Sequence, residues 1–94
     1  MPLHRYVIER DVPDIGSLDR SELAAAAAKS NAALRELAPA IHWLHSYVAG
    51  DKTFCVYLAE NEEVIRRHAE LSGFPATRIT RVKSILDPTS ETDG

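Results

Sequence analysis

The sequence predicts a small α+β domain with the order strand–helix–strand–strand–helix–strand. Three features indicate this order: a capping box near residue 19, two strand-like runs joined by a Gly-Asp turn, and a later helix that ends at a glycine. With 94 residues the chain has the length of one domain with one core. We expect that domain over residues 1–86 and a polar, disordered tail over residues 87–94.

The first strand is expected over residues 4–10, where aromatic and β-branched residues follow Pro2. A helix should begin after Asp19, because Asp19 and Glu22 have the spacing of a capping box. The alanine run at 24–28 favours this helix and allows it to approach a sheet closely. Pro39 should end it. One apolar stripe of the helix consists of Leu23, Ala27, Ser30, Leu34 and Leu37.

A β-hairpin is expected in the middle of the chain, from residues 41–48 and 53–59 with Gly50-Asp51 as its loop. That loop sets His45 opposite Val56 and Ser46 opposite Cys55. Strict alternation then gives two faces. One face carries Ile41, Trp43, His45, Tyr47, Phe54, Val56 and Leu58. The other carries His42, Leu44, Ser46, Val48, Thr53, Cys55 and Tyr57.

The second helix is expected to begin after Asn61 as N-cap and to end at Gly73. Its apolar stripe consists of Val64, Ile65, His68 and Leu71. A last strand is expected over about residues 78–82. The resulting β-α-β-β-α-β order is that of the ferredoxin-like fold. Right-handed crossovers place both helices on one face of a four-stranded antiparallel sheet.

The other face of the sheet is left without a helix. Because the hairpin is apolar on both faces, a monomer would expose a large apolar patch. We therefore expect a homodimer closed through that face, or a ligand cleft there.

Several classes of protein are disfavoured by composition. No charged leader or long apolar run is present, which argues against secretion and membrane spanning. A net charge of −3 and a third strand without the glycines of RNA-recognition domains argue against nucleic-acid binding. Cys55 is the only cysteine, which excludes an internal disulfide and suits the reducing cytoplasm.

Four histidines invite a metal interpretation. His42 and His45 are expected on opposite strand faces, so they should not chelate one ion together, and His4 and His42 should be exposed. His45 and His68 are better candidates, since each is a polar residue in an apolar row. A histidine on an apolar face is usually a hydrogen-bonded core or rim residue, and this is the alternative for each of them.

Cys55 can be a small buried hydrophobe, a metal ligand or a nucleophile. His68 can act as its base only if Cys55 lies on the helix-covered face. Trp43 and Tyr47 fit core or dimer contacts, or a platform for a cofactor. The charged residues 9–11 are expected at a solvated strand end, with the rim of a cleft as the alternative.

Four motifs together resemble a family of small bacterial proteins classed as a domain of unknown function, one branch of which includes a nickel-binding protein. They are YVIERD at 6–11, WLHSYV at 43–48, DKTFCVY at 51–57, and HA at 68–69 followed by GFPA at 73–76. The resemblance implies a ferredoxin-like fold and a homodimer that binds nickel in the cleft between its subunits. His45, Cys55 and His68 stand at the family's most recognisable positions, which makes them the implied metal ligands.

The leading hypothesis is a cytoplasmic homodimeric metal-binding protein, for nickel or another divalent transition metal, rather than an enzyme. One alternative is a dimeric α+β barrel that binds or converts a small molecule, with His45 as general base. Another is a structural or regulatory dimer without a ligand.

Overall fold

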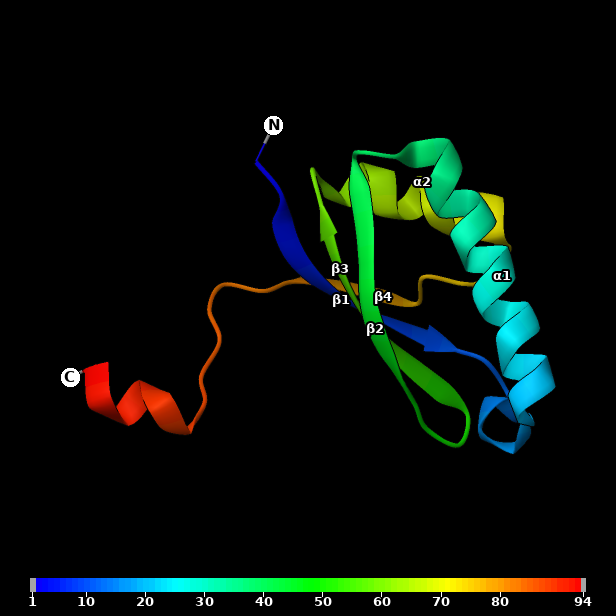
Figure 1. The fold of residues 1–94 in the computed structure, drawn as a ribbon, viewed down its shortest axis with the longest axis horizontal. Helices are drawn as coiled ribbons and strands as arrows, with labels where there is room; N and C mark the ends of the chain where they lie inside the picture. Colours follow the sequence, from blue (N-terminus) through cyan, green and yellow to red (C-terminus); the bar gives the residue numbers. More distant parts are fainter. Residues whose placement is uncertain (1, 94) are drawn as a thin grey trace.

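The computed structural model describes residues 2–93, so Met1 and Gly94, the outer ends of the predicted domain and tail, lie outside the described residues. The strands and helices are, in order, β1 (His4–Asp11), α1 (Arg20–Leu37), β2 (Ile41–Val48), β3 (Lys52–Ala59), α2 (Glu62–Ser72) and β4 (Arg78–Arg81). The strands form one antiparallel sheet of order β2-β3-β1-β4. Both helices lie on the same side of it (Figure 1). The predicted ferredoxin-like arrangement is therefore confirmed.

Helix α1 begins with the predicted capping box. The backbone N–H of Glu22 donates to the Asp19 carboxylate at 2.8 Å, and the Glu22 carboxylate accepts from the Asp19 N–H at 3.0 Å. The helix buries only two of its side chains, Ser30 and Ala33, while Leu34 and Leu37 pack at the edge of the core. The alanine run permits a close approach to the sheet, but here a cavity lies between the two.

Helix α2 packs more tightly against the sheet. The Asn61 side chain caps it by accepting from the Val64 N–H, and Gly73 ends it with a φ of 80° that favours glycine. Ile65 and His68 are both completely buried. Leu71 was expected on the buried stripe but is 46% exposed. Ser72 takes the buried position instead.

The β2–β3 hairpin has the predicted Gly50-Asp51 loop, closed by a 2.8 Å hydrogen bond from the Ala49 N–H to the Lys52 carbonyl. The predicted pairs, His45 with Val56 and Ser46 with Cys55, are confirmed. The loop also contacts the 3-10 turn Ile15–Ser17, where the Gly16 N–H donates to the Gly50 carbonyl at 2.9 Å.

A β-bulge in β2 changes the faces that alternation predicts. Trp43 pairs with Tyr57 and His45 with Val56, so Leu44 is an extra residue between two consecutive pairs. Each residue before the bulge therefore points to the face opposite to the one expected. Ile41 and Trp43 turn toward the helices, and His42 turns to the open face. The predicted faces were wrong for these residues.

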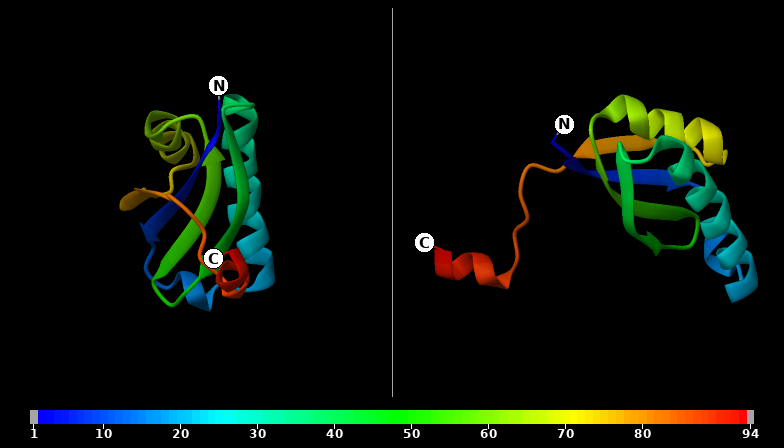
Figure 2. Two further views of the ribbon diagram at one scale, coloured as in Figure 1. Left: turned by 90° about the vertical axis from the view of Figure 1, so that its left-hand side faces the viewer. Right: turned by 45° about the horizontal axis from the view of Figure 1, so that its top comes forward.

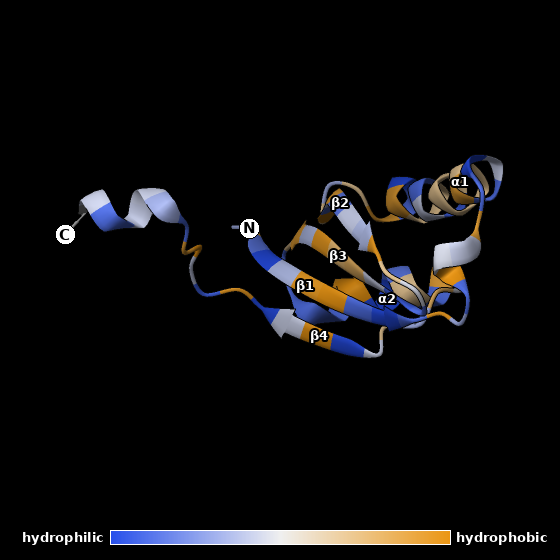
Figure 3. Cartoon of the chain, turned by 90° about the horizontal axis from the view of Figure 1, so that it is seen from below, coloured by the Kyte–Doolittle hydropathy of each residue, from blue (hydrophilic) through white to orange (hydrophobic). Residues whose placement is uncertain are grey.

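The hydrophobic core lies between the sheet and the helices. It consists of Tyr6, Ile8, Ile41, Cys55, Tyr57, Ala59 and Ile65. Figure 3 shows the order of the four strands, the apolar middle of β1, and α2 behind the sheet. The open face carries a second apolar row, which consists of Val7, Phe54, Val56 and Leu58.

The chain leaves the sheet after β4. The Val82 N–H still donates to the Arg5 carbonyl at 2.8 Å, and the segment beyond runs away from the domain to a 3-10 turn, Pro88–Asp93 (Figure 2). Leu86 on this segment is 88% exposed. The domain boundary at residue 86 and the disorder of the tail stay predictions. Within residues 2–93, no helix combines the length and the apolar character needed to cross a membrane.

Candidate functional site

The sheet separates the three residues predicted as metal ligands. His45 is exposed on the open face of β2. Cys55 and His68 are buried on the covered side, one in β3 and the other in α2. One chain does not bring the three around a single ion. Across residues 2–93, no three His, Cys, Asp or Glu side chains form a group that could hold a metal.

The open face holds a pair of imidazoles that the sequence interpretation missed. His42 pairs with Leu58 and His45 with Val56, two residues of β3 that point to the same face. His42 and His45 therefore share the open face, and the expectation that they diverge was wrong. Both are exposed, as the sequence predicts for His42. The His45 ring meets the edge of Tyr47 with centroids 5.1 Å apart. The β-bulge at Leu44 brings these two imidazoles to one face, which strict alternation along β2 does not predict.

His68 is a neutral imidazole in the core. Its Nε2 lies 3.3 Å from both the hydroxyl and the carbonyl oxygen of Ser30, and its ring packs on Tyr57. Burial lowers the pKa of His68, and the nearby Arg10 guanidinium lowers it further. Its Nδ1 has no hydrogen-bond partner among the described residues. The imidazole therefore keeps one nitrogen that is not engaged by the protein.

Cys55 has the surroundings of a small buried hydrophobe. Its side chain lies in the core cluster, with the Thr53 hydroxyl 3.5 Å from its Sγ. It does lie on the helix-covered face, which is the condition for a dyad with His68. No hydrogen bond joins these two side chains in the described structure.

A cavity of about 240 Å³ lies between α1 and the sheet. Trp43 lines it, and the indole Nε1 donates to the Ser46 hydroxyl at 2.9 Å. Tyr47, by contrast, projects from the open face and is 62% exposed. The two aromatic residues predicted to hold a cofactor therefore lie on opposite sides of the sheet.

Arg10 also lines this cavity and is only 3% exposed. Its Nη1 donates to the carbonyl oxygens of Phe74 and Pro75 at 3.2 and 2.9 Å, and its Nη2 donates to the Tyr57 hydroxyl at 3.3 Å. The expectation of a solvated strand end was wrong for Arg10. Alternation along β1 would have predicted the buried position, because Arg10 continues the inward row of Tyr6 and Ile8.

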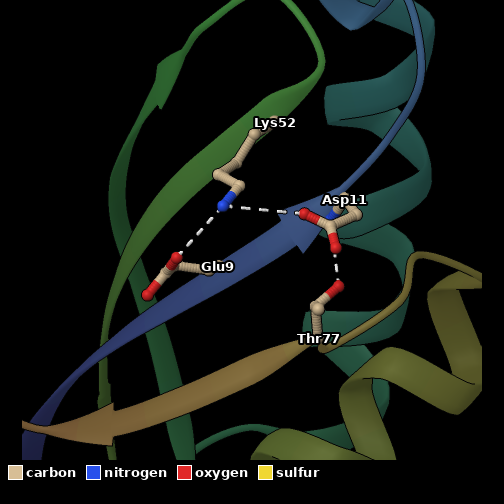
Figure 4. A network of polar contacts seen from close by, with 4 residues as sticks. All are labelled: Glu9, Asp11, Lys52 and Thr77. Carbon is tan, nitrogen blue, oxygen red and sulfur yellow. Dashed lines mark hydrogen bonds and ion pairs between the residues drawn. The ribbon is translucent and has the colours of Figure 1, made fainter.

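The neighbours of Arg10 do form a solvated ionic group (Figure 4). Lys52 Nζ lies 3.3 Å from Glu9 and 3.8 Å from Asp11, and the Asp11 backbone N–H donates to the Thr77 hydroxyl. These charges lie at the end of β1, as the sequence predicts. Lys52 neutralises part of their negative charge, so the group is a poor site for a cation. It forms a polar border at one end of the open face.

Comparisons with known proteins agree with the fold. The family model described as nickel responsive protein SCO4226-like matches residues 6–82. A solved structure, the crystal structure analysis of SCO4226 from Streptomyces coelicolor A3(2), superposes with a TM-score of 0.72 at 15% sequence identity. The match covers 87% of this chain and 99% of that one. No curated protein matches the chain. The family resemblance predicted from the motifs is confirmed.

Proposed function

We propose, because this chain belongs to the SCO4226-like nickel responsive protein family, that it binds nickel as a cytoplasmic homodimer. The observation that carries the proposal is the exposed imidazole pair, His42 and His45, on the sheet face that no helix covers. Neutral imidazole is a good ligand for nickel and its neighbouring divalent metals. A single unpaired thiol suits a reducing compartment.

A second copy of the chain would complete the donor set. Two imidazoles are too few to hold a structural ion, and no group of three donors forms within residues 2–93. A two-fold dimer uses the same patch of both copies, so it would bring two His42–His45 pairs to one interface. The cleft between subunits would then contain the metal.

The open face has the composition expected of such an interface. Its centre is the row of Val7, Phe54, Val56 and Leu58, next to the exposed ring of Tyr47. The ionic group around Lys52 forms a polar border at one end. An apolar centre with a polar rim and an aromatic anchor is typical of protein interfaces.

Calorimetric titration of metal-free protein with nickel chloride tests this proposal. Replacing both His42 and His45 by alanine should weaken binding at least tenfold, because both proposed ligands are removed. His4→Ala is the matched control. It removes an imidazole that lies on a strand other than β2 and is hydrogen-bonded to Arg81. Its affinity should stay within about twofold of the wild type. Lower pH should weaken nickel binding, because protonated imidazole cannot ligate.

Three outcomes would redirect the proposal. Unchanged affinity in the His42/His45 double variant would remove the open-face site. Loss of binding in His68→Ala or Cys55→Ala alone would instead assign the metal to the covered side, where these two of the predicted ligands lie. If the wild-type protein binds no nickel, two interpretations remain: a dimer that binds or converts a small molecule, and a dimer without a ligand.

A further inference from the structure

Arg10 is a buried cation without an acidic partner in the described part of the chain. The ion pairs of residues 2–93 involve Lys52 and Arg66 instead. Carbonyl oxygens and the Tyr57 hydroxyl accept three of its N–H groups. Nη1 and Nη2 are thus both hydrogen-bonded within the protein, but only to neutral groups. A buried charge without a counter-charge is costly, so this guanidinium favours an anion beside it.

The cavity beside Arg10 has room for that anion. It is partly open to solvent and has a volume of about 240 Å³. Most of its wall is apolar, with Trp43, Leu23 and Val48 among the lining residues. A few polar groups in an otherwise apolar cavity are typical of small-molecule sites.

Tyr57 adds a second donor next to Arg10. Its oxygen accepts from Arg10 and also interacts with the Ser30 side chain, and the phenol keeps one hydrogen that can be donated to a ligand. Burial raises the pKa of Tyr57, although Arg10 partly opposes this shift. The phenol therefore stays protonated at neutral pH. Arginine and tyrosine together present donors, and no charged acceptor, to the cavity.

We propose that the cavity under α1 binds a small organic acid, whose carboxylate pairs with Arg10 and Tyr57 and whose hydrocarbon part contacts Trp43. The planar guanidinium matches a carboxylate, and one positive charge balances one negative charge. A dianionic phosphate would leave a buried charge unbalanced. This site lies on the opposite side of the sheet from His42 and His45, so the two proposals can fail separately.

Trp43 makes the test direct, because it is the only tryptophan and it lines the cavity. Its fluorescence is followed while the protein is titrated with sodium hexanoate, and in parallel with hexanamide, which has the same length and no charge. We expect a saturable change at millimolar hexanoate and at least tenfold weaker binding of hexanamide. Equal affinities, or no saturable change with hexanoate, would overturn the proposal.

Variants separate the cavity from the rest of the surface. Ala27→Leu places a larger side chain in the cavity and should abolish hexanoate binding, whereas Ala28→Leu, on the exposed side of α1, should not. Arg10→Met keeps much of the length without the charge and should weaken binding at least tenfold. If this variant does not fold, the hexanamide comparison and Ala27→Leu still decide. Wild-type affinity for hexanoate in Ala27→Leu would refute the assigned cavity, while nickel binding should be unchanged in that variant.

Discussion

The buried His68 predicts how stability depends on pH. Its pKa in the folded protein lies below the ordinary value of 6.5, because burial and then Arg10 disfavour the charged ring. The unfolded chain therefore takes up this proton first as the pH falls. The stability contribution of the neutral ring is complete above pH 6.5 and is lost as the pH falls toward the lower pKa of the folded state.

The size of this effect follows from one proton. Between the two pKa values, the free energy of unfolding should fall by up to about 1.4 kcal/mol for each pH unit. At about pH 5.5 the loss attributable to His68 is therefore at most about 1.4 kcal/mol. The structure explains why the folded state resists protonation. A proton on Nδ1 would find no acceptor among the described residues, and the new charge would lie near Arg10.

Urea unfolding of the wild type and of His68→Gln at a series of pH values between about 7.5 and 5.5 measures this. Glutamine cannot titrate, and it retains a donor for the Ser30 carbonyl. Subtracting the two profiles removes the contributions of all other groups. The wild type should lose stability more steeply below pH 6.5 than the variant does. Parallel profiles over this range would refute the assignment of a neutral, buried His68.

Three further predictions concern the fold and the dimer. Gly16→Ala should destabilise the protein by about 1–3 kcal/mol, because a Cβ there would lie 2.5 Å from a backbone oxygen of the hairpin loop. Gly50→Ala, which has no atom within 4 Å of the added Cβ, should cost less than about 0.5 kcal/mol in the same denaturation assay. Ile65→Ala should cost about 2–5 kcal/mol and half-exposed Leu71→Ala about 1 kcal/mol or less, and similar losses for the two would contradict the described packing of α2. If the protein is the proposed dimer, Tyr47→Asp should convert it to a monomer, as measured by light scattering, and a variant that stays dimeric would exclude the open face as the interface.

Features that depend on neighbouring residues could be predicted from the sequence. The capping box at Asp19 and Glu22 and the Gly50-Asp51 loop each involve only a few positions, so their side-chain chemistry determines the local backbone. The order of the elements followed from these signals, and the family resemblance agreed with it. The register beyond the hairpin loop was also correct as far as His45.

Features that depend on packing could not be predicted in the same way. Leu44 fits a regular strand as well as a bulge, so nothing in the composition of β2 marks the extra residue that reverses the faces of His42 and Trp43. The cavity depends on how far α1 lies from the sheet, which short alanine side chains do not determine. Arg10 was missed for another reason. It stands between the charged residues Glu9 and Asp11, so the local composition indicates a solvated strand end although alternation places Arg10 in the inward row.

A crystal structure of the protein soaked with nickel tests the central claim most directly. The proposal predicts anomalous scattering from nickel between two open sheet faces, with His42 and His45 as ligands in each of two copies. Nickel bound by His68 and Cys55 on the helix-covered side, or a monomer with its open face in solvent, would contradict it.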